Sequence, residues 1–153
     1  MLSIILLSYY SKNRIPEAFF KVREIMEAND IPFEFIVMDD GSKDESYAVA
    51  LELERKYKNV RAYQLSRNYS STYSAFAGLS VCLGDCATII VDDEQQPYST
   101  LVEMYRIWEK GEKAIIPYRT KRNDGFITTC PLTLTHPASI KFLAFSRDTQ
   151  ISF

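Results

Sequence analysis

Acidic side chains follow two apolar stretches of the chain, and they are the groups best suited to chemistry. Residues 92–94 read Asp-Asp-Glu directly after the apolar residues 87–91, and residues 39–42 read Asp-Asp-Gly-Ser after residues 33–38. Three adjacent carboxylates repel one another unless solvent or a cation separates their charges. Carboxylate and amide oxygens suit hard ions such as Mg²⁺ or Mn²⁺, which in turn hold substrate phosphates. A carboxylate at the end of a strand can also accept hydrogen bonds from a nucleobase or a ribose.

Both acidic segments also have a purely structural interpretation. An acidic cluster in a loop is usually a solvated turn. The Asp-Asp-Gly-Ser segment can be a strand-to-helix turn, in which Gly41 takes an unusual backbone angle and Ser42 caps the next helix. Glu45 would then complete a capping box with Ser42. The structural and the chemical interpretation can hold together, so the alternatives stay open at this point.

The sequence gives little support for a catalytic triad, a glycine-rich nucleotide-binding loop, a nucleic-acid interface or a disulfide framework. His136 is the single histidine and stands in a loop-like segment, so no Ser-His-Asp arrangement can be argued. Neither a GxGxxG nor a GxxxxGK[ST] pattern occurs, which weakens a dinucleotide-binding or P-loop interpretation. The net charge of -2 and the scattered basic residues argue against nucleic acid as a partner. Three cysteines do not form a disulfide framework, and Cys82 and Cys86 are expected to be small core residues.

Apolar patterns predict strands that alternate with helices. Continuous apolar runs indicate buried strands, and apolar residues at helical spacing indicate amphipathic helices. We expect strands at 3–8, 33–38, 60–65, 87–91 and 114–117, and helices after Asn13, after Ser42, over 71–83 and over 99–110. This alternation favours an α/β fold with a mainly parallel sheet and helices on both faces. Ligands bind such sheets at the carboxyl ends of the strands, where the acidic segments lie.

Four segments, in order and with matching gaps, resemble family-2 glycosyltransferases with the GT-A (Rossmann-like) fold. The similarity is greatest to the polyprenyl-phosphate sugar transferases, which include dolichol-phosphate mannose synthase-like enzymes. SIILLSY at 3–9 resembles their opening strand, and FEFIVMDDGSKDES at 33–46 resembles their second strand and DDGS-x-D turn. LSRNYSSTYSAFAGL at 65–79 matches LSRNFGKEAALLAGL, and GDCATIIVDDEQQP at 84–97 matches GDAVVVIDADLQDP. IIPYR at 115–119 resembles a further strand, so the resemblance covers about residues 2–122.

This resemblance implies a nucleoside-diphosphate sugar donor, UDP- or GDP-linked, and a divalent cation, Mg²⁺ or Mn²⁺. By position, Tyr9 and Asp39 would border the nucleobase, with Asp40 beside them. The positions assigned to nucleotide binding are Tyr9, Asp39, Asp40, Asp92 and Arg119, the last near the diphosphate. Those in the metal-binding places are Asp93 and Gln95. The first acid of the family's DxD stretch falls on Val91, and Tyr10 stands where the family has Asn. Arg67 and Asn68 of the intact SRN motif are expected to fix the loop rather than to touch substrate.

The implied reaction is the transfer of a sugar from the donor to a polyprenyl-phosphate or cell-surface glycan acceptor, as in polysaccharide biosynthesis. We expect residues 1–122 to form the nucleotide-sugar-binding core and residues 123–153 an irregular, partial acceptor-side segment. The family's catalytic domain continues further, so the chain is expected to be truncated, and neither a catalytic base nor an acceptor site can be assigned. A non-catalytic nucleotide-sugar-binding homologue is the alternative. We expect a cytoplasmic protein. Three further alternatives stay open: association with the inner face of the membrane, a missing membrane-anchored segment, and a homo-oligomer.

Overall fold

Strands and helices alternate along the chain in a computed structural model, which describes residues 1–93, 97–112 and 115, and the backbone of residues 145–146. The elements are β1 (Leu2–Ser8), α1 (Arg14–Ala28), β2 (Phe33–Asp39), α2 (Ser46–Lys56), β3 (Val60–Gln64), α3 (Ser71–Ser80), β4 (Cys86–Val91), α4 (Thr100–Glu109) and β5 (Phe145–Ser146). The first four predicted strands are confirmed to within one residue at each end. The predicted strand at 114–117 lies outside the described residues except for Ile115, which packs against the core.

The strands form one sheet in the order β3-β2-β1-β4-β5, in which the first four are parallel and the short β5 runs antiparallel to β4. β1 therefore lies at the centre, between β2 and β4. The register pairs Ser8 with Asp39 on one side and Leu7 with Val91 on the other. The carboxyl ends of these three strands are thus level with one another, and the α/β class with a mainly parallel sheet is confirmed.

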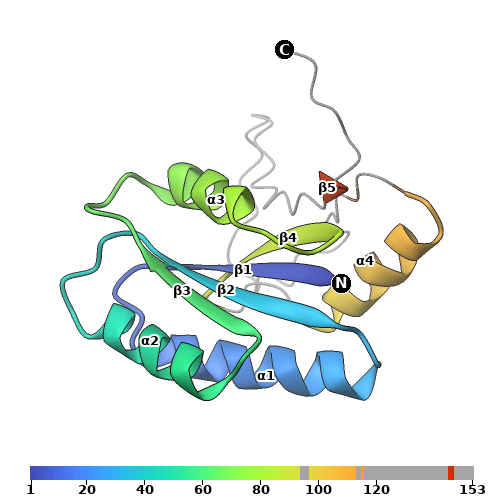
Figure 1. Cartoon of the computed structure of the whole chain (residues 1–153), viewed down its shortest axis with the longest axis horizontal. Helices are drawn as coiled ribbons and strands as arrows, with labels where there is room; N and C mark the ends of the chain where they lie inside the picture. Colours follow the sequence, from blue (N-terminus) through green and yellow to red (C-terminus); the bar gives the residue numbers. More distant parts are fainter. Residues whose placement is uncertain (94–96, 113–114, 116–144, 147–153) are drawn as a thin grey trace, which may run out of the picture.

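Helices cover both faces of the sheet, and Figure 1 shows α1 and α2 below it and α3 above it. The larger core lies on the α1 and α2 side and includes Phe19, Val22 and Phe35, each with no exposed surface. Ile5 and Ile36 point to the opposite face, where α3 packs. Gly78 makes this packing close, because a Cβ there would lie 2.5 Å from Ile5 Cγ2.

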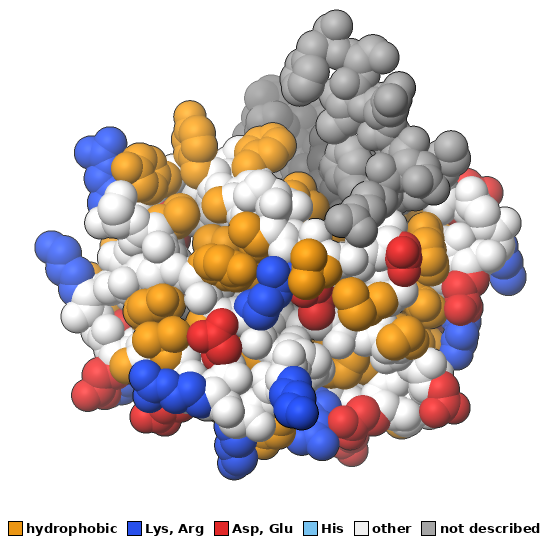
Figure 2. Space-filling view, in the orientation of Figure 1, with side chains coloured by type: hydrophobic (Ala, Val, Ile, Leu, Met, Phe, Trp, Pro, Cys, Tyr) orange, Lys and Arg blue, Asp and Glu red, His pale blue; other side chains and the backbone are white. Residues whose placement is uncertain are grey.

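The face of the molecule in Figure 2 carries basic and acidic side chains side by side along its lower part, where α1 and α2 lie. Hydrophobic side chains gather over the upper part near α3, and Tyr73 and Phe76 on this helix are 65% and 67% exposed. No helix within the described ranges is both long and apolar enough to span a membrane.

Two expected features of the helix ends are corrected by the structure. α2 begins at Ser46 with Glu45 at its N-cap, so the predicted capping box of Ser42 and Glu45 is wrong. The Ser42 hydroxyl is instead engaged with Asp39 and with the backbone N–H of Tyr10. α3 ends at Ser80 rather than at residue 83. The predicted N-cap position of Asn13 is right, although its side chain makes no capping hydrogen bond.

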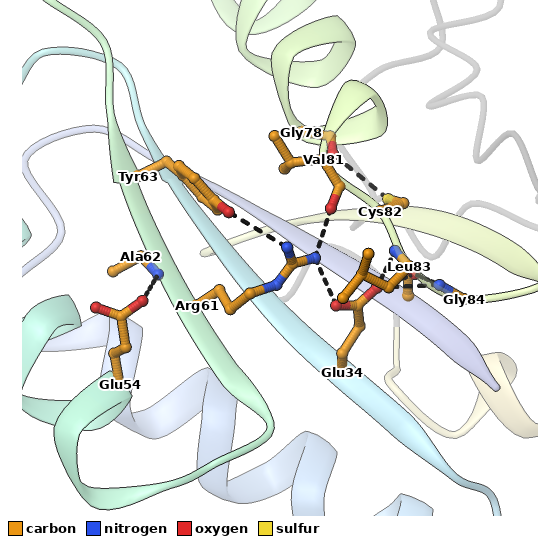
Figure 3. A network of polar contacts seen from close by, with 11 residues as sticks. Glu34, Glu54, Arg61, Ala62, Tyr63, Gly78, Val81, Cys82, Leu83 and Gly84 are labelled. Atoms are coloured by element: carbon orange, nitrogen blue, oxygen red, sulfur yellow. Dashed lines mark hydrogen bonds and ion pairs between the residues drawn. The ribbon is translucent and has the colours of Figure 1, made fainter.

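α3 ends early because the segment after it is held by the amino-terminal edge of the sheet (Figure 3). The backbone N–H groups of Leu83 and Gly84 donate to Glu34 Oε1 at 2.6 and 3.1 Å, and Ser3 Oγ donates to the same oxygen. Arg61 Nη2 donates to Glu34 Oε2 at 2.5 Å. These bonds join β1, β2, β3 and the turn before β4 through one carboxylate. Glu34 is only 5% exposed, so the cluster is buried.

The cysteines within the described residues have the structural role that we expected. Cys86 is buried at the start of β4. Cys82 follows α3 and packs against the smaller group of buried residues, which includes Ile5 and Ile36. Burial raises the pKa of the Cys86 thiol to about 11, so the reactive thiolate is scarce at neutral pH. Cys130, His136 and the predicted segment 123–153 lie outside the described residues, apart from β5.

Candidate functional site

The predicted site residues that the structure describes follow strands of the sheet at its carboxyl edge. Tyr9 follows β1, Asp40 follows β2, and Asp92 follows β4. Because β1 lies between the other two strands, these three residues line one cleft of about 270 Å³. Asn68 and the first turn of α3 complete its wall. We call this hollow the cleft. Because the loops after all three strands lie at the same edge of the sheet, one ligand in the cleft can contact each of them.

Tyr9 and Asp40 present an aromatic ring and a carboxylate to the cleft. Tyr9 is 44% exposed and packs edge-on against Tyr10, with 4.6 Å between the ring centroids. Asp40 is almost fully buried, and its Oδ1 accepts the backbone N–H of Tyr69 at 2.9 Å. The carboxylate therefore ties the loop after β3 to the end of β2.

Asp39 is the last residue of β2 and has no exposed surface. Its Oδ2 accepts the backbone N–H of Ser42 and the amide of Gln64, both at 2.9 Å, and its Oδ1 accepts the Ser42 hydroxyl. Ser42 Oγ in turn accepts the backbone N–H of Tyr10 at 2.9 Å. These contacts give Asp39 a structural role in joining the turns after β1 and β2. Its assignment to the nucleobase stays a prediction.

Gly41 lets the loop after β3 approach the loop after β2. Its φ is +73°, and a Cβ there would lie 2.5 Å from the carbonyl carbon of Arg67 and 2.7 Å from its Cα. Both atoms are backbone, so they cannot move aside as a side chain can. Arg67 Cζ lies 4.7 Å from the centroid of the Tyr69 ring, and Asn68 Oδ1 accepts the backbone N–H of Ser70. These contacts are consistent with the expected role of Arg67 and Asn68 in fixing the loop.

Gly41→Ala is expected to lower the free energy of unfolding by about 2–5 kcal/mol, because the left-handed φ costs about 1–2 kcal/mol and the backbone clash about 1–3 kcal/mol. Urea denaturation measures this loss. Gly111→Ala is the matched control, since Gly111 has a φ of +102° but no atom of the described residues within 4 Å of its Cβ position. Equal losses in both variants would show that the approach to Arg67 adds nothing.

Asp92 lies between the cleft and a second hollow of about 200 Å³, which Asp93, Arg14 and Tyr98 also line. Arg14 Nη2 is 3.4 Å from Asp92 Oδ2, and Ser11 Oγ donates to the same oxygen. Burial raises the pKa of Asp92, and the charge of Asp93 raises it further, while Arg14 opposes both effects. A second cation beside this pair of carboxylates would relieve the remaining repulsion.

The donor set around Asp92 and Asp93 fits a hard divalent cation, since its ligand atoms are carboxylate oxygens. Within the described ranges no three His, Cys, Asp or Glu side chains are arranged to hold a metal. Glu94 and Gln95 follow directly but lie outside those ranges, as does Arg119. The structure thus brings together Tyr9, Asp40 and Asp92 and sets Asp93 in the adjoining hollow. Asp39 is fully buried, and neither Gln95 nor Arg119 lies within the described residues.

The α3 side of the cleft is the part that sequence reasoning missed. Asn68, Ser70, Ser71 and Ser74 line it, and Ser70 adopts a φ of +83°. Ser74 is 1% exposed, and its hydroxyl has no hydrogen-bond partner within the described part of the chain. The available signal was the departure from LSRNFGKEAALLAGL, in which Gly stands at the place of Ser70 and Ala at the place of Ser74.

Comparison with known proteins agrees with this geometry. The model of "Glycosyl transferase family 2" matches residues 3–150. The undecaprenyl-phosphate 4-deoxy-4-formamido-L-arabinose transferase of Pseudomonas syringae is 27% identical over 151 residues, which are 98% of this chain and 43% of that protein. The bactoprenol glucosyl transferase of Shigella phage SfV is 26% identical over 125 residues, which are 81% of this chain and 41% of that protein. The chain thus spans less than half the length of these curated relatives.

A solved structure supports the fold. The mannosyltransferase PcManGT from Pyrobaculum calidifontis, in complex with GDP-Man and Mn²⁺, superposes with a TM-score of 0.61 at 16% identity. The superposition covers 74% of this chain and 33% of that one. The sequence match extends over nearly the whole chain, and the sheet has the GT-A arrangement that the motifs predicted. The chain belongs to glycosyltransferase family 2.

Proposed function

We propose that this chain is the donor-binding part of a glycosyltransferase that moves a sugar from a UDP- or GDP-linked donor to a polyprenyl-phosphate or cell-surface glycan acceptor. The observation that carries the proposal is the convergence of Tyr9, Asp40 and Asp92 from three neighbouring strands into one cleft, with Asp93 in the adjoining hollow. A nucleotide needs a surface for its base, acceptors for its N–H and hydroxyl groups, and a cationic environment for its diphosphate. The cleft and its neighbouring hollow offer groups suited to each.

The nucleoside end of the donor would lie against Tyr9 and Asp40. The exposed ring of Tyr9 can stack on a base, and the carboxylate of Asp40 can accept a hydrogen bond from it. Asp92 is suited to a ribose hydroxyl, because Arg14 and Ser11 fix one of its oxygens and hold the side chain in place.

The diphosphate end would lie toward Asp93. Mg²⁺ or Mn²⁺ held by Asp93 and Gln95 would stabilise the charge that develops on the diphosphate as the sugar–phosphate bond breaks. Arg119 would contribute a second positive charge there. A lipid-phosphate acceptor is already anionic and needs little help from a base to attack the anomeric carbon. Such an acceptor would also bring the protein to a membrane surface. The two relatives described above, an undecaprenyl-phosphate sugar transferase and a bactoprenol glucosyl transferase, support this acceptor class.

Calorimetric titration with UDP and with GDP, each with and without Mn²⁺, tests donor binding. We expect at least one of the two nucleotides to bind, and to bind more tightly with Mn²⁺. A chain that binds neither nucleotide would contradict the proposal. An assay of sugar release or transfer from the donor then separates an enzyme from a non-catalytic nucleotide-sugar-binding homologue, which would bind without turnover.

A further inference from the structure

Ser70, at the α3 side of the cleft, adopts a backbone conformation that normally requires glycine. Its φ of +83° and ψ of 160° lie in a region that a residue with a Cβ rarely enters. Asp30, in the turn after α1, also has a positive φ, of +53°, but aspartate tolerates the left-handed region. The pattern LSRNFGKEAALLAGL carries Gly at the place of Ser70, as this conformation requires. Ser70 is therefore a strained residue.

Backbone contacts on both sides hold Ser70 in this conformation. Its N–H donates to Asn68 Oδ1 at 3.1 Å, and its carbonyl accepts the N–H of Ser74 at 3.2 Å. The preceding residue, Tyr69, donates its N–H to Asp40 Oδ1 at 2.9 Å. A glycine at position 70 would make the same backbone contacts without strain. The contacts thus explain the conformation, but they do not explain why a side chain is present.

Two hydroxyls of the cleft wall are available to a ligand. Ser70 and Ser74 both line the cleft, one helical turn apart on the same side of α3. The Ser74 hydroxyl is buried and has no hydrogen-bond partner among the described residues, and the Ser70 hydroxyl likewise has none there. The family pattern has Gly and Ala at these two places, so neither hydroxyl belongs to it. A buried hydroxyl without a partner is unfavourable, and a ligand that bonds to it is favoured.

The surroundings of the two hydroxyls favour an uncharged oxygen as their partner. The N–H groups in the first turn of α3 have no acceptor within the helix, and the helix dipole places partial positive charge there. A phosphate would meet the carboxylates of Asp40 and Asp92, which line the same cleft. The carbonyl and hydroxyl oxygens of a nucleoside can accept hydrogen bonds from serine without this repulsion.

We infer that Ser70 and Ser74 donate hydrogen bonds to the nucleoside of the donor, and that the strain at Ser70 is retained because its side chain contacts this ligand. We call these residues the serine pair. The inference rests on the proposed function, which supplies the nucleotide. It goes further by assigning two ligand-binding residues at places where the family pattern has no hydroxyl.

Ser70→Gly is expected to change stability and affinity in opposite directions. Relief of strain should raise the midpoint of thermal unfolding of the ligand-free protein by about 2–4 °C. Loss of the hydroxyl should weaken nucleotide binding in excess Mn²⁺ about three- to tenfold. Calorimetric titration measures this loss with UDP or GDP, whichever binds the parent protein more tightly. Unchanged affinity would overturn the role of Ser70.

Two further variants separate the hydroxyl of Ser70 from its backbone strain. Ser70→Ala keeps the Cβ and therefore the strain, so affinity should fall as far as in Ser70→Gly without the rise in unfolding midpoint. Asp30→Gly is the matched control, because Asp30 has a positive φ but is exposed and does not line the cleft. It should leave the affinity unchanged. Affinity kept in Ser70→Ala but lost in Ser70→Gly would assign the effect to conformation and overturn the inference.

Ser74→Ala tests the second hydroxyl, with Thr72→Ala as the matched control, since Thr72 is exposed and does not line the cleft. Affinity is expected to fall about three- to tenfold in Ser74→Ala and to stay unchanged in Thr72→Ala. The unfolding midpoint should not fall in Ser74→Ala, because the lost hydroxyl has no partner in the described residues. Unchanged affinity in Ser74→Ala would overturn the role of Ser74.

The double variant Ser70→Gly with Ser74→Ala tests which end of the nucleotide the serine pair contacts. Affinity should fall at least about tenfold, while the dependence of the remaining affinity on Mn²⁺ concentration stays that of the parent protein. A weakened Mn²⁺ dependence would place the hydroxyls at the diphosphate and overturn the assignment to the nucleoside. If the parent protein binds neither UDP nor GDP, the proposed function fails as well. If the parent binds and the double variant binds equally well, only this inference fails.

Discussion

Asp93→Ala is expected to abolish the Mn²⁺-dependent part of nucleotide binding while the protein stays folded. Asp93 is exposed in the hollow beside the cleft, so removal of its carboxylate takes little from the core. The carboxylate would be a direct ligand of the cation. Loss of an outer partner of a metal ligand already weakens metal binding about 10–100-fold, so loss of the ligand itself should weaken it by more than about 100-fold.

Calorimetric titration of UDP with and without Mn²⁺ measures this effect, and thermal unfolding without metal checks the fold. Asp85→Ala serves as the matched control. Asp85 is also an exposed aspartate, and it pairs with the amino terminus at the opposite edge of the sheet. It should leave the Mn²⁺ dependence unchanged. If Asp93→Ala keeps the Mn²⁺ dependence of the parent protein, the cation is bound elsewhere.

Most of the sheet could be predicted from the sequence because β1, β2 and β4 are largely apolar runs. Apart from Glu34 and Thr88, residues 33–38 and 87–91 are apolar. In a chain of alternating strands and helices, such runs favour a parallel sheet that is covered on both sides. The acidic residues after these strands then had to lie at one edge. Asp40 and Asp92 line one cleft for that reason, although 51 other residues stand between them in the sequence.

The error at the start of α2 has a physical cause that the local pattern does not contain. Ser42 and Glu45 have the spacing of a capping box, but a serine hydroxyl bonds to whichever partner the fold brings near. Asp39 and the backbone N–H of Tyr10 reach Ser42 because β1 and β2 are neighbours. Tertiary contacts thus moved the helix start to residue 46.

The α3 wall of the cleft could not be predicted for a related reason. Ser74 departs from the alanine of the family pattern, but Ser71 departs from that pattern as well, so the departure alone does not show which serine is buried at the cleft. The burial of Ser74 depends on how closely α3 lies on the sheet, which Gly78 and Ile5 determine across more than 70 residues of sequence. Partners so distant in sequence are visible only in three dimensions.

Glu34→Ala is expected to lower the free energy of unfolding by about 3–5 kcal/mol, because it leaves the buried partners of an ion pair without a counterpart. Glu34 accepts from Ser3 Oγ, Arg61 Nη2 and the N–H groups of residues 83 and 84 (Figure 3). Arg61 is only 24% exposed, so its charge would be poorly solvated. Urea denaturation at neutral pH measures the loss.

Glu34→Gln separates the charge of this side chain from its shape. The amide oxygen can still accept from Ser3 and the turn before β4, but the amide N–H groups face the guanidinium of Arg61. We expect an intermediate loss, smaller than that of Glu34→Ala. Glu54→Gln is the matched control, because Glu54 also accepts a backbone N–H, that of Ala62, but shows no bond to an arginine within the described residues. A loss as small in Glu34→Gln as in the control would show that the ion pair contributes little.

The pH dependence of stability gives an independent check on the charge. Burial raises the pKa of Glu34, but the hydrogen bonds from Ser3 and Leu83 and the charge of Arg61 together hold it below its usual value. The stabilisation by the ionised carboxylate is therefore complete above the unfolded pKa of about 4.3 and is lost as the pH falls through the lower, folded pKa. The stability difference between the parent protein and Glu34→Gln should shrink on acidification through that range. A difference that stays constant with pH would assign the effect to hydrogen-bond geometry, since only the ionised form of Glu34 distinguishes the two chains electrostatically.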